Sequence, residues 1–295
     1  PGREPRPHDH EPDSWSFLAV SGAGWSGSGA VFDHLRGHRR ALAVPGESRL
    51  LEGQYGFRSL LANSEPDLGP QERLDLLRFC LLGFAPCTDW NDYRHVRNAR
   101  RAATGPGAVA YATVCADVMD DLAHPGARTT LPAAARSLLD ASIQGQLGTM
   151  DGVPILDNVV HIRHLGELAP IVPQVYFLAV VRDPRDQFLD NVRHNPRFRL
   201  DALRFARRYR HVRSLLETAE QEHPASIRVI QFEHFVGDPG FRDDSIADLV
   251  SHLGHPDRRP HFDPDRSREN IGLWKASQHQ DIDLISNELE EFLVD

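Results

Sequence analysis

The sequence is poor in lysine and cysteine, and each shortage argues against a class of protein. Lys275 is the only lysine among 33 basic residues, and the net charge is −9, so the chain as a whole is not built to bind nucleic acid. Its three cysteines, Cys80, Cys87 and Cys115, form no close C-x-x-C pair. This spacing argues against a disulfide framework or a zinc knuckle, and it favours a reducing cytoplasm.

Long apolar runs and metal-binding patterns are also missing. No stretch of about 18 consecutive apolar residues occurs, so we expect no membrane-spanning segment. The 16 histidines include no H-E-x-x-H or similar spacing, so we expect no metal site. Residues 1–14 are charged and Pro-rich and contain no apolar signal-peptide core. We expect a mobile leader there, followed by a single domain over residues 15–295.

Short apolar runs alternate with amphipathic segments, and this alternation predicts the fold class. Strands are expected at residues 17–20, 41–44, 153–156, 175–181 and 227–232. Helices are expected at 30–35, from about 200 to 222 in an Arg-rich stretch, and at 282–293. The pattern predicts an α/β fold of three layers, with a mostly parallel sheet of about five strands like that of the P-loop nucleotide-binding proteins.

Residues 53–150 interrupt this alternation and show no convincing strand. Amphipathic segments at Glu72–Leu82, Val109–Leu122 and Pro132–Leu147 are separated by proline and glycine. We therefore expect a mainly helical insertion after the second strand.

A glycine-rich turn, residues 21–29, follows the first strand and precedes a helix. Its glycines let the backbone approach a phosphate closely, and the helix offers unpaired N–H groups. The turn fits G-x-G-x-x-G, with Glu47 twenty residues after Gly27, so a dinucleotide site is one interpretation. The G-K-S/T ending of nucleoside triphosphatases is absent. A turn that binds nothing is the remaining interpretation.

Arg182 follows directly after the fourth expected strand. An arginine at the carboxyl end of a buried strand is placed to meet an anion in the ligand crevice, and Pro184 is expected to begin the next helix. A dinucleotide dehydrogenase does not need this arginine, whereas a protein that binds a ligand with a second, remote phosphate does.

Four motifs in register resemble the sulfotransferase family, whose members use 3′-phosphoadenosine 5′-phosphosulfate. Residues 24–29 resemble its 5′-phosphosulfate loop, and residues 181–186 resemble its 3′-phosphate motif. Residues 230–239, with Leu253-Gly254 further on, resemble the family segment written YEDLV-x-DP…FLG. Residues 272–275 resemble its G-x-W-(K/R) element. The resemblance covers most of the chain apart from residues 53–150.

The resemblance implies a sulfuryl transfer to a hydroxyl or amine of a small-molecule acceptor, without a metal. A homodimer is a possible assembly, and the sequence does not determine the oligomeric state. The donor-binding residues that it implies are Gly24, Trp25, Ser26, Gly27, Ser28, Gly29, Ala30, Arg182, Asp190, Arg268 and Lys275. Different branches of the family place the catalytic base after the second strand or after the third, which implies Glu47 or His161 here. His161 lies four residues after Asp157, so on a helix the two side chains would share a face.

Two departures from the family pattern leave alternatives open. Trp25 stands where the family has a basic residue, and Lys275 is a candidate source of the missing charge. Asp190 stands where the family has a hydroxyl, and a carboxylate beside a phosphate is unfavourable. Either the donor is held differently or Asp190 turns away from it. The alternatives to a sulfotransferase are an NAD(P)-dependent oxidoreductase and a non-catalytic nucleotide-binding relative of the family.

Overall fold

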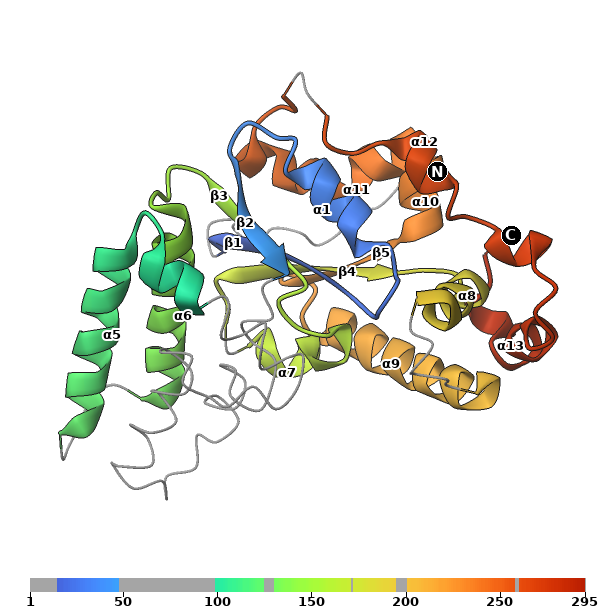
Figure 1. Cartoon of the computed structure of the whole chain (residues 1–295), viewed down its shortest axis with the longest axis horizontal. Helices are drawn as coiled ribbons and strands as arrows, with labels where there is room; N and C mark the ends of the chain where they lie inside the picture. Colours follow the sequence, from blue (N-terminus) through green and yellow to red (C-terminus); the bar gives the residue numbers. More distant parts are fainter. Residues whose placement is uncertain are drawn as a thin grey trace, which may run out of the picture.

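A parallel sheet of five strands forms the centre of the chain (Figure 1). The computed structural model describes residues 15–47, 99–124, 130–170, 172–194, 201–257 and 260–294. The strands are β1 (Phe17–Gly22), β2 (Ala41–Glu47), β3 (Val153–Asp157), β4 (Val175–Val181) and β5 (Ile227–Gln231). They lie in the order β2-β3-β1-β4-β5, and every neighbouring pair is parallel. The predicted α/β class and strand number are confirmed.

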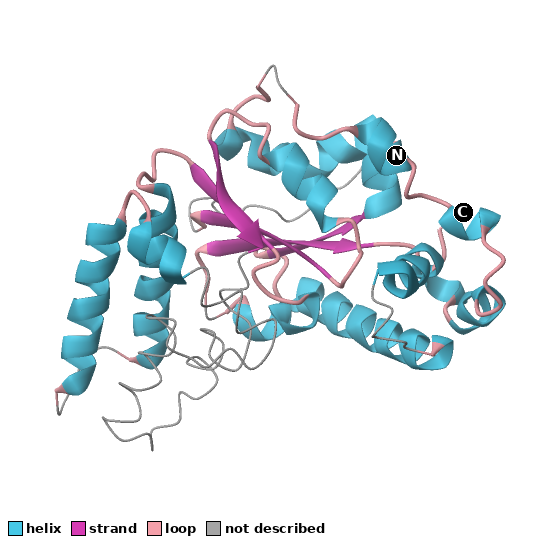
Figure 2. Cartoon of the chain, viewed as in Figure 1, coloured by secondary structure: helices cyan, strands magenta, loops and turns pink. Residues whose placement is uncertain are grey.

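Helices cover both faces of the sheet, which gives the three predicted layers (Figure 2). Every residue of β1 and β4 is buried, as expected for strands that are covered on both sides. One face carries α1 (Ser28–Leu35), α10 (Phe232–Gly237) and α11 (Pro239–Leu253). The other face carries α6 (Leu131–Leu147), α7 (Leu165–Leu168) and α9 (Ala202–Glu222).

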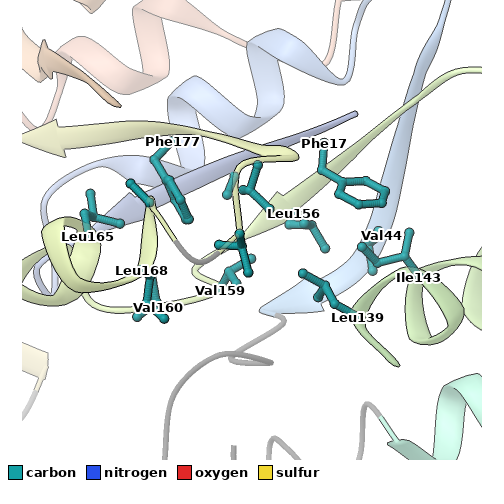
Figure 3. Packing of buried hydrophobic residues seen from close by; sticks show 14 of the residues in the cluster. Phe17, Val44, Leu139, Ile143, Leu156, Val159, Val160, Leu165, Leu168 and Phe177 are labelled. Atoms are coloured by element: carbon teal, nitrogen blue, oxygen red, sulfur yellow. The ribbon is translucent and has the colours of Figure 1, made fainter. Parts of the chain in front are cut away.

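The described residues of the predicted insertion are helical. α5 (Ala108–Ala123) packs along α6, and α6 contacts β2 at the edge of the sheet. Figure 3 shows Leu139 and Ile143 of α6 in the same apolar cluster as Val44 and Leu156 of the sheet. Residues 53–98 and 125–129, which include the expected segment 72–82, lie outside the described residues. The boundaries of the insertion therefore stay a prediction.

The C-terminal segment lies beside the carboxyl ends of the strands, next to α8 (Pro184–His194) (Figure 1). It contains α12 (Pro264–Arg268), the 3₁₀ turn η3 (Leu273–Ala276), α13 (Ile282–Glu288) and the 3₁₀ turn η4 (Glu290–Phe292). The predicted single helix over residues 282–293 is wrong, because Leu289 leaves the helical conformation. Leu289 is fully buried in the cluster around Phe188, so tertiary packing overrides the local helical pattern.

Three buried charged residues at the start of α8 hold this C-terminal segment. The Asp186 carboxylate accepts hydrogen bonds from the N–H groups of Gly272, at 2.7 Å, and Trp274, at 3.0 Å. Asp183 accepts one from the Val294 N–H at 3.0 Å, and the Arg185 guanidinium lies 3.6 Å from the centre of the Trp274 ring. Burial raises the pKa of Asp186, while the two backbone hydrogen bonds act in the opposite direction.

None of the described helices is long and apolar enough to cross a membrane. The Arg-rich face of α9 is largely solvated. Arg204, Arg207 and Arg208 are exposed there, and Arg210 pairs with Glu291 at 2.9 Å. No arginine of this helix lines the pocket described below, so α9 serves as a covering helix of the sheet.

Replacing Asp186 with alanine should lower the free energy of unfolding by about 1–3 kcal/mol, because two backbone donors lose their acceptor. Urea unfolding followed by circular dichroism measures this. Asp283→Ala, on the exposed face of α13, is the matched control and should change stability by less than about 0.5 kcal/mol. Equal stabilities for the two variants would contradict the anchoring role of Asp186.

Candidate functional site

A pocket of about 510 Å³ lies at the carboxyl ends of β1 and β4. Its walls come from the glycine-rich turn, the first turn of α1, the end of α8, Phe232, and residues 261–270. The predicted donor-binding residues that line it are Trp25, Gly27, Gly29, Ala30, Arg182 and Asp190. The chain therefore brings residues from two distant motifs together at the edge of the sheet where parallel α/β folds bind ligands.

The glycine-rich turn has the backbone geometry of an anion site. Gly27 has a positive φ of 85°, and a Cβ atom there would lie 2.2 Å from the Phe232 ring. The Ser26 N–H donates to the Ala23 carbonyl, and the Ala30 N–H donates to the Gly27 carbonyl. In the described chain no backbone carbonyl accepts from the amides of residues 27–29, which begin α1. Such amides at a helix start favour a phosphate or sulfate group.

Trp25 is the residue that departs from the family pattern in this turn. Its φ of 65° lies in the left-handed region, which bulky residues rarely adopt. Its carbonyl accepts a hydrogen bond from Arg182 Nη1 at 3.0 Å. The residue is 41% exposed, and its ring stacks on His194 with 4.3 Å between the ring centroids. The indole therefore lies at the rim of the pocket, where it brings no charge of its own.

Arg182 is 2% exposed and joins four parts of the fold. Nη1 donates to Asp190 Oδ2 at 2.6 Å as well as to Trp25, and Nη2 donates to the Asn270 carbonyl. The guanidinium carbon lies 5.4 Å from the centre of the Phe232 ring. Among the described residues, none accepts a hydrogen bond from the buried Nε. Asp190 thus pairs directly with Arg182, and its orientation toward a bound donor stays a prediction.

Two supporting residues were not found from the sequence. Glu233 accepts from the Asp183 N–H at 2.8 Å, and burial raises the pKa of this carboxyl group. Gln187 donates to the Gly24 carbonyl at 2.7 Å, which ties α8 to the glycine-rich turn. Both residues lie inside or beside the recognised motifs, yet only the fold shows that they contact another motif.

Glu47 ends β2, beside Asp157 at the end of β3. Asn158, the next residue, donates from its amide to Ser28 Oγ at 3.4 Å and to Asp157 Oδ1 at 3.1 Å. Because β3 lies between β2 and β1, Glu47 is two strand spacings, roughly 10 Å, from the end of β1. A dinucleotide fold instead pairs its second strand with the first, so that the acid reaches the ribose. The strand order therefore contradicts the dinucleotide interpretation of Glu47.

His161 precedes the 3₁₀ turn η2 (Ile162–His164), and its Nδ1 accepts a hydrogen bond from the Arg163 N–H at 3.2 Å. The predicted shared helix face of Asp157 and His161 is wrong, because Asp157 belongs to β3 and helical structure begins only at Ile162. Asn158, at φ 46°, turns the chain between them. His161 is buried at the N-terminus of this turn.

Arg268 and Lys275 are not among the described residues that line the pocket. Arg268 pairs with Asp265 at 2.7 Å, and the exposed Lys275 Nζ lies 5.4 Å from the centre of the Trp274 ring. Their part in donor binding stays a prediction. The described residues include no group of three or more His, Cys, Asp or Glu side chains that could hold a metal ion.

Comparison with known proteins identifies the family of this chain. The model of the Sulfotransferase family matches residues 61–258, which is more than half of the chain, so the chain belongs to the sulfotransferase family. The match includes Arg182 and Phe232 and lies beyond the glycine-rich turn. Membership supports an enzyme that transfers a sulfuryl group. A search of the curated proteins gave no match.

Two solved structures are similar over most of this chain. The sulfotransferase domain from the Synechococcus PCC 7002 olefin synthase has 17% identity and a TM-score of 0.38, and covers 95% of this chain and 90% of its own. The sulfotransferase STF9 from Mycobacterium avium has 13% identity and a TM-score of 0.44, and covers 95% of this chain and 76% of its own.

Gly27→Ala should lower the free energy of unfolding by about 2–4 kcal/mol, because alanine is strained at this φ and its Cβ collides with Phe232. Gly29→Ala is the matched control, since a Cβ there meets no atom within 4 Å. In a helix, that change should leave stability unchanged or raise it by up to about 1 kcal/mol. Urea denaturation of both variants tests the geometry of the turn, and an unaffected Gly27→Ala protein would contradict it.

Proposed function

We propose that this protein transfers a sulfuryl group from 3′-phosphoadenosine 5′-phosphosulfate to a hydroxyl or amine of a small-molecule acceptor. One observation carries the proposal: a buried strand-end arginine and the amides at the start of α1 line the same pocket. These are two separate anion-binding elements, and the proposed donor has one phosphate on each side of its ribose. In this arrangement Arg182 binds the 3′-phosphate, and the amides of residues 27–29 bind the 5′-phosphate.

The proposed reaction needs little covalent chemistry from the protein. The acceptor oxygen or nitrogen attacks sulfur while the bond between sulfur and the bridging phosphate oxygen breaks. The acceptor loses its proton to a base, and adenosine 3′,5′-bisphosphate leaves as the second product. Positive charge and amide dipoles around the sulfuryl oxygens and the leaving phosphate stabilise the transition state, as in phosphoryl transfer.

Of the two candidate bases, we favour Glu47 for its position at the end of β2. The His161 Nδ1 already accepts a hydrogen bond, so the proton of a neutral ring lies on Nε2 and neither ring nitrogen is ready to take another. Glu47 stands at the carboxyl end of its strand, on the same edge of the sheet as the pocket. An ionised carboxylate can take a proton from the acceptor directly. An acceptor bound between Glu47 and the glycine-rich turn would present its proton to this group.

The remaining features agree with a protein of the reducing cytoplasm. Cys115 is a buried free thiol, and burial raises its pKa to about 11, which keeps it unreactive. We propose cytoplasmic localisation on this ground. A homodimer stays a prediction, as does the absence of nucleic-acid and membrane partners.

Arg182→Gln should weaken binding of adenosine 3′,5′-bisphosphate by about 10- to 150-fold, the loss of one charge-assisted hydrogen-bonding group. Arg207→Gln, on the exposed face of α9, removes the same charge from a residue that does not line the pocket and should leave the affinity unchanged. Isothermal titration measures both, and thermal melting checks that each variant folds. Stabilisation of the wild type by NAD alone would replace the proposal with the oxidoreductase alternative.

Glu47→Gln should leave the affinity for adenosine 3′,5′-bisphosphate nearly intact and reduce turnover by about 10²- to 10⁴-fold, as expected for loss of a general base. His161→Ala is the comparison variant. Transfer of ³⁵S from the donor to a panel of hydroxyl and amine acceptors measures both. If only His161→Ala abolishes turnover, the base is His161. If the wild type binds the nucleotide but transfers to no acceptor, the non-catalytic alternative holds.

A further inference from the structure

A hydrogen bond from Arg101 joins the helical insertion to the strand that carries Glu47. Residues 99–104 are helical, and Arg101 Nη1 donates to the Pro45 carbonyl of β2. Pro45 lies two residues before Glu47, the base of the proposed reaction. Arg101 belongs to none of the four motifs and is not among the residues that line the donor pocket.

The part of β2 that Arg101 contacts is irregular. Between its pairs at Ala43 and Glu47, β2 contains three residues where β3 contains one. Such a bulge disrupts the ladder hydrogen bonds of a strand. Pro45 has no N–H group to donate to the ladder, and Gly46 has a φ of 71°. The sheet therefore fixes this segment less firmly than the start of β2, and the hydrogen bond from Arg101 is a further constraint on it.

The helix that carries Arg101 is itself held closely against the sheet. Ala102 is fully buried, and a Cβ atom on Gly145 of α6 would lie 2.9 Å from the Ala102 carbonyl oxygen, so the two helices approach closely. α6 in turn packs on β2 through Ile143, which lies in the same apolar cluster as Val44 (Figure 3). The backbone from which Arg101 extends is thus fixed relative to the bulge.

We propose that Arg101 is a positioning residue: its hydrogen bond to the Pro45 carbonyl fixes the bulge and so places the Glu47 carboxylate where it takes the acceptor's proton. This inference rests on the proposed function, with Glu47 as its base. A charge-assisted hydrogen bond is stronger than a neutral one, and moving a reacting group by about 1 Å can cost about 100-fold in rate. The insertion thereby takes part in the reaction through Glu47.

The first test is turnover of the Arg101→Met variant, which keeps an unbranched apolar stem and loses every donor. Its kcat should fall about 10- to 100-fold, because the base is displaced. The KM values of donor and acceptor should stay nearly unchanged, as should the affinity for adenosine 3′,5′-bisphosphate, because the binding groups are intact. Transfer of ³⁵S to a hydroxyl or amine acceptor that the wild type uses measures the kinetics, and isothermal titration measures the affinity.

The Glu47→Gln background separates positioning from a general effect on structure. In that background Arg101→Met should lower kcat by no more than about twofold further, because the two residues act as a unit. Arg101→Lys keeps a charged donor on a flexible stem and should recover part of the lost turnover. Arg100→Met, at the exposed neighbouring position, is the matched control and should leave kcat unchanged. Thermal melting verifies that each variant folds.

Several results would overturn the inference while sulfuryl transfer stands. Equal losses of kcat from Arg101→Met in both backgrounds would show that Arg101 acts independently of Glu47. A raised acceptor KM with an unchanged kcat would make Arg101 a binding group for the acceptor. Normal turnover by Glu47→Gln would place the base elsewhere, and Arg101 would have no base to position. A wild type that transfers to no acceptor removes the proposed function, and the inference fails with it.

Discussion

The buried guanidinium of Arg182 is the interaction on which the arrangement of the site depends. It leaves the end of β4 and contacts the glycine-rich turn, α8, the C-terminal segment and the Phe232 ring. Burying a charged group costs free energy unless the group is paired and hydrogen-bonded. The groups that accept hydrogen bonds from Arg182 are therefore held in fixed positions. The Tyr209 hydroxyl, which donates to the Arg182 carbonyl at 2.6 Å, fixes the backbone from the side of α9.

The same principle extends to the other charged residues of this segment. Asp183, Arg185 and Asp186 are buried. Asp183 and Arg185 form an ion pair at 2.6 Å, and all three side chains also contact backbone groups or the Trp274 ring of the C-terminal segment. That segment, through residues 261–270, forms one wall of the pocket. Residues 181–186, which resemble an anion-binding motif, therefore also hold one wall of the pocket against the sheet.

The elements that could be predicted from the sequence are those determined by local pattern. β1 and β4 are continuous apolar runs, and the glycine-rich turn can be recognised from its composition. Non-local features were not accessible: the strand order that separates Glu47 from β1, the pairing of Asp190 with Arg182, and the anchoring of Gly272 by Asp186. The end of α13 at Glu288 was not predicted for the same reason. Leu289 is fully buried against residues that are distant in the sequence, and this packing ends the helix.

The most direct measurement is a crystal structure of the protein with adenosine 3′,5′-bisphosphate. We expect the 3′-phosphate within hydrogen-bond distance of the Arg182 guanidinium and the 5′-phosphate on the amides of residues 27–29, with the nucleotide inside the pocket at the ends of β1 and β4. A nucleotide bound elsewhere, or bound in this pocket with no phosphate near Arg182 or near α1, would contradict the central claim.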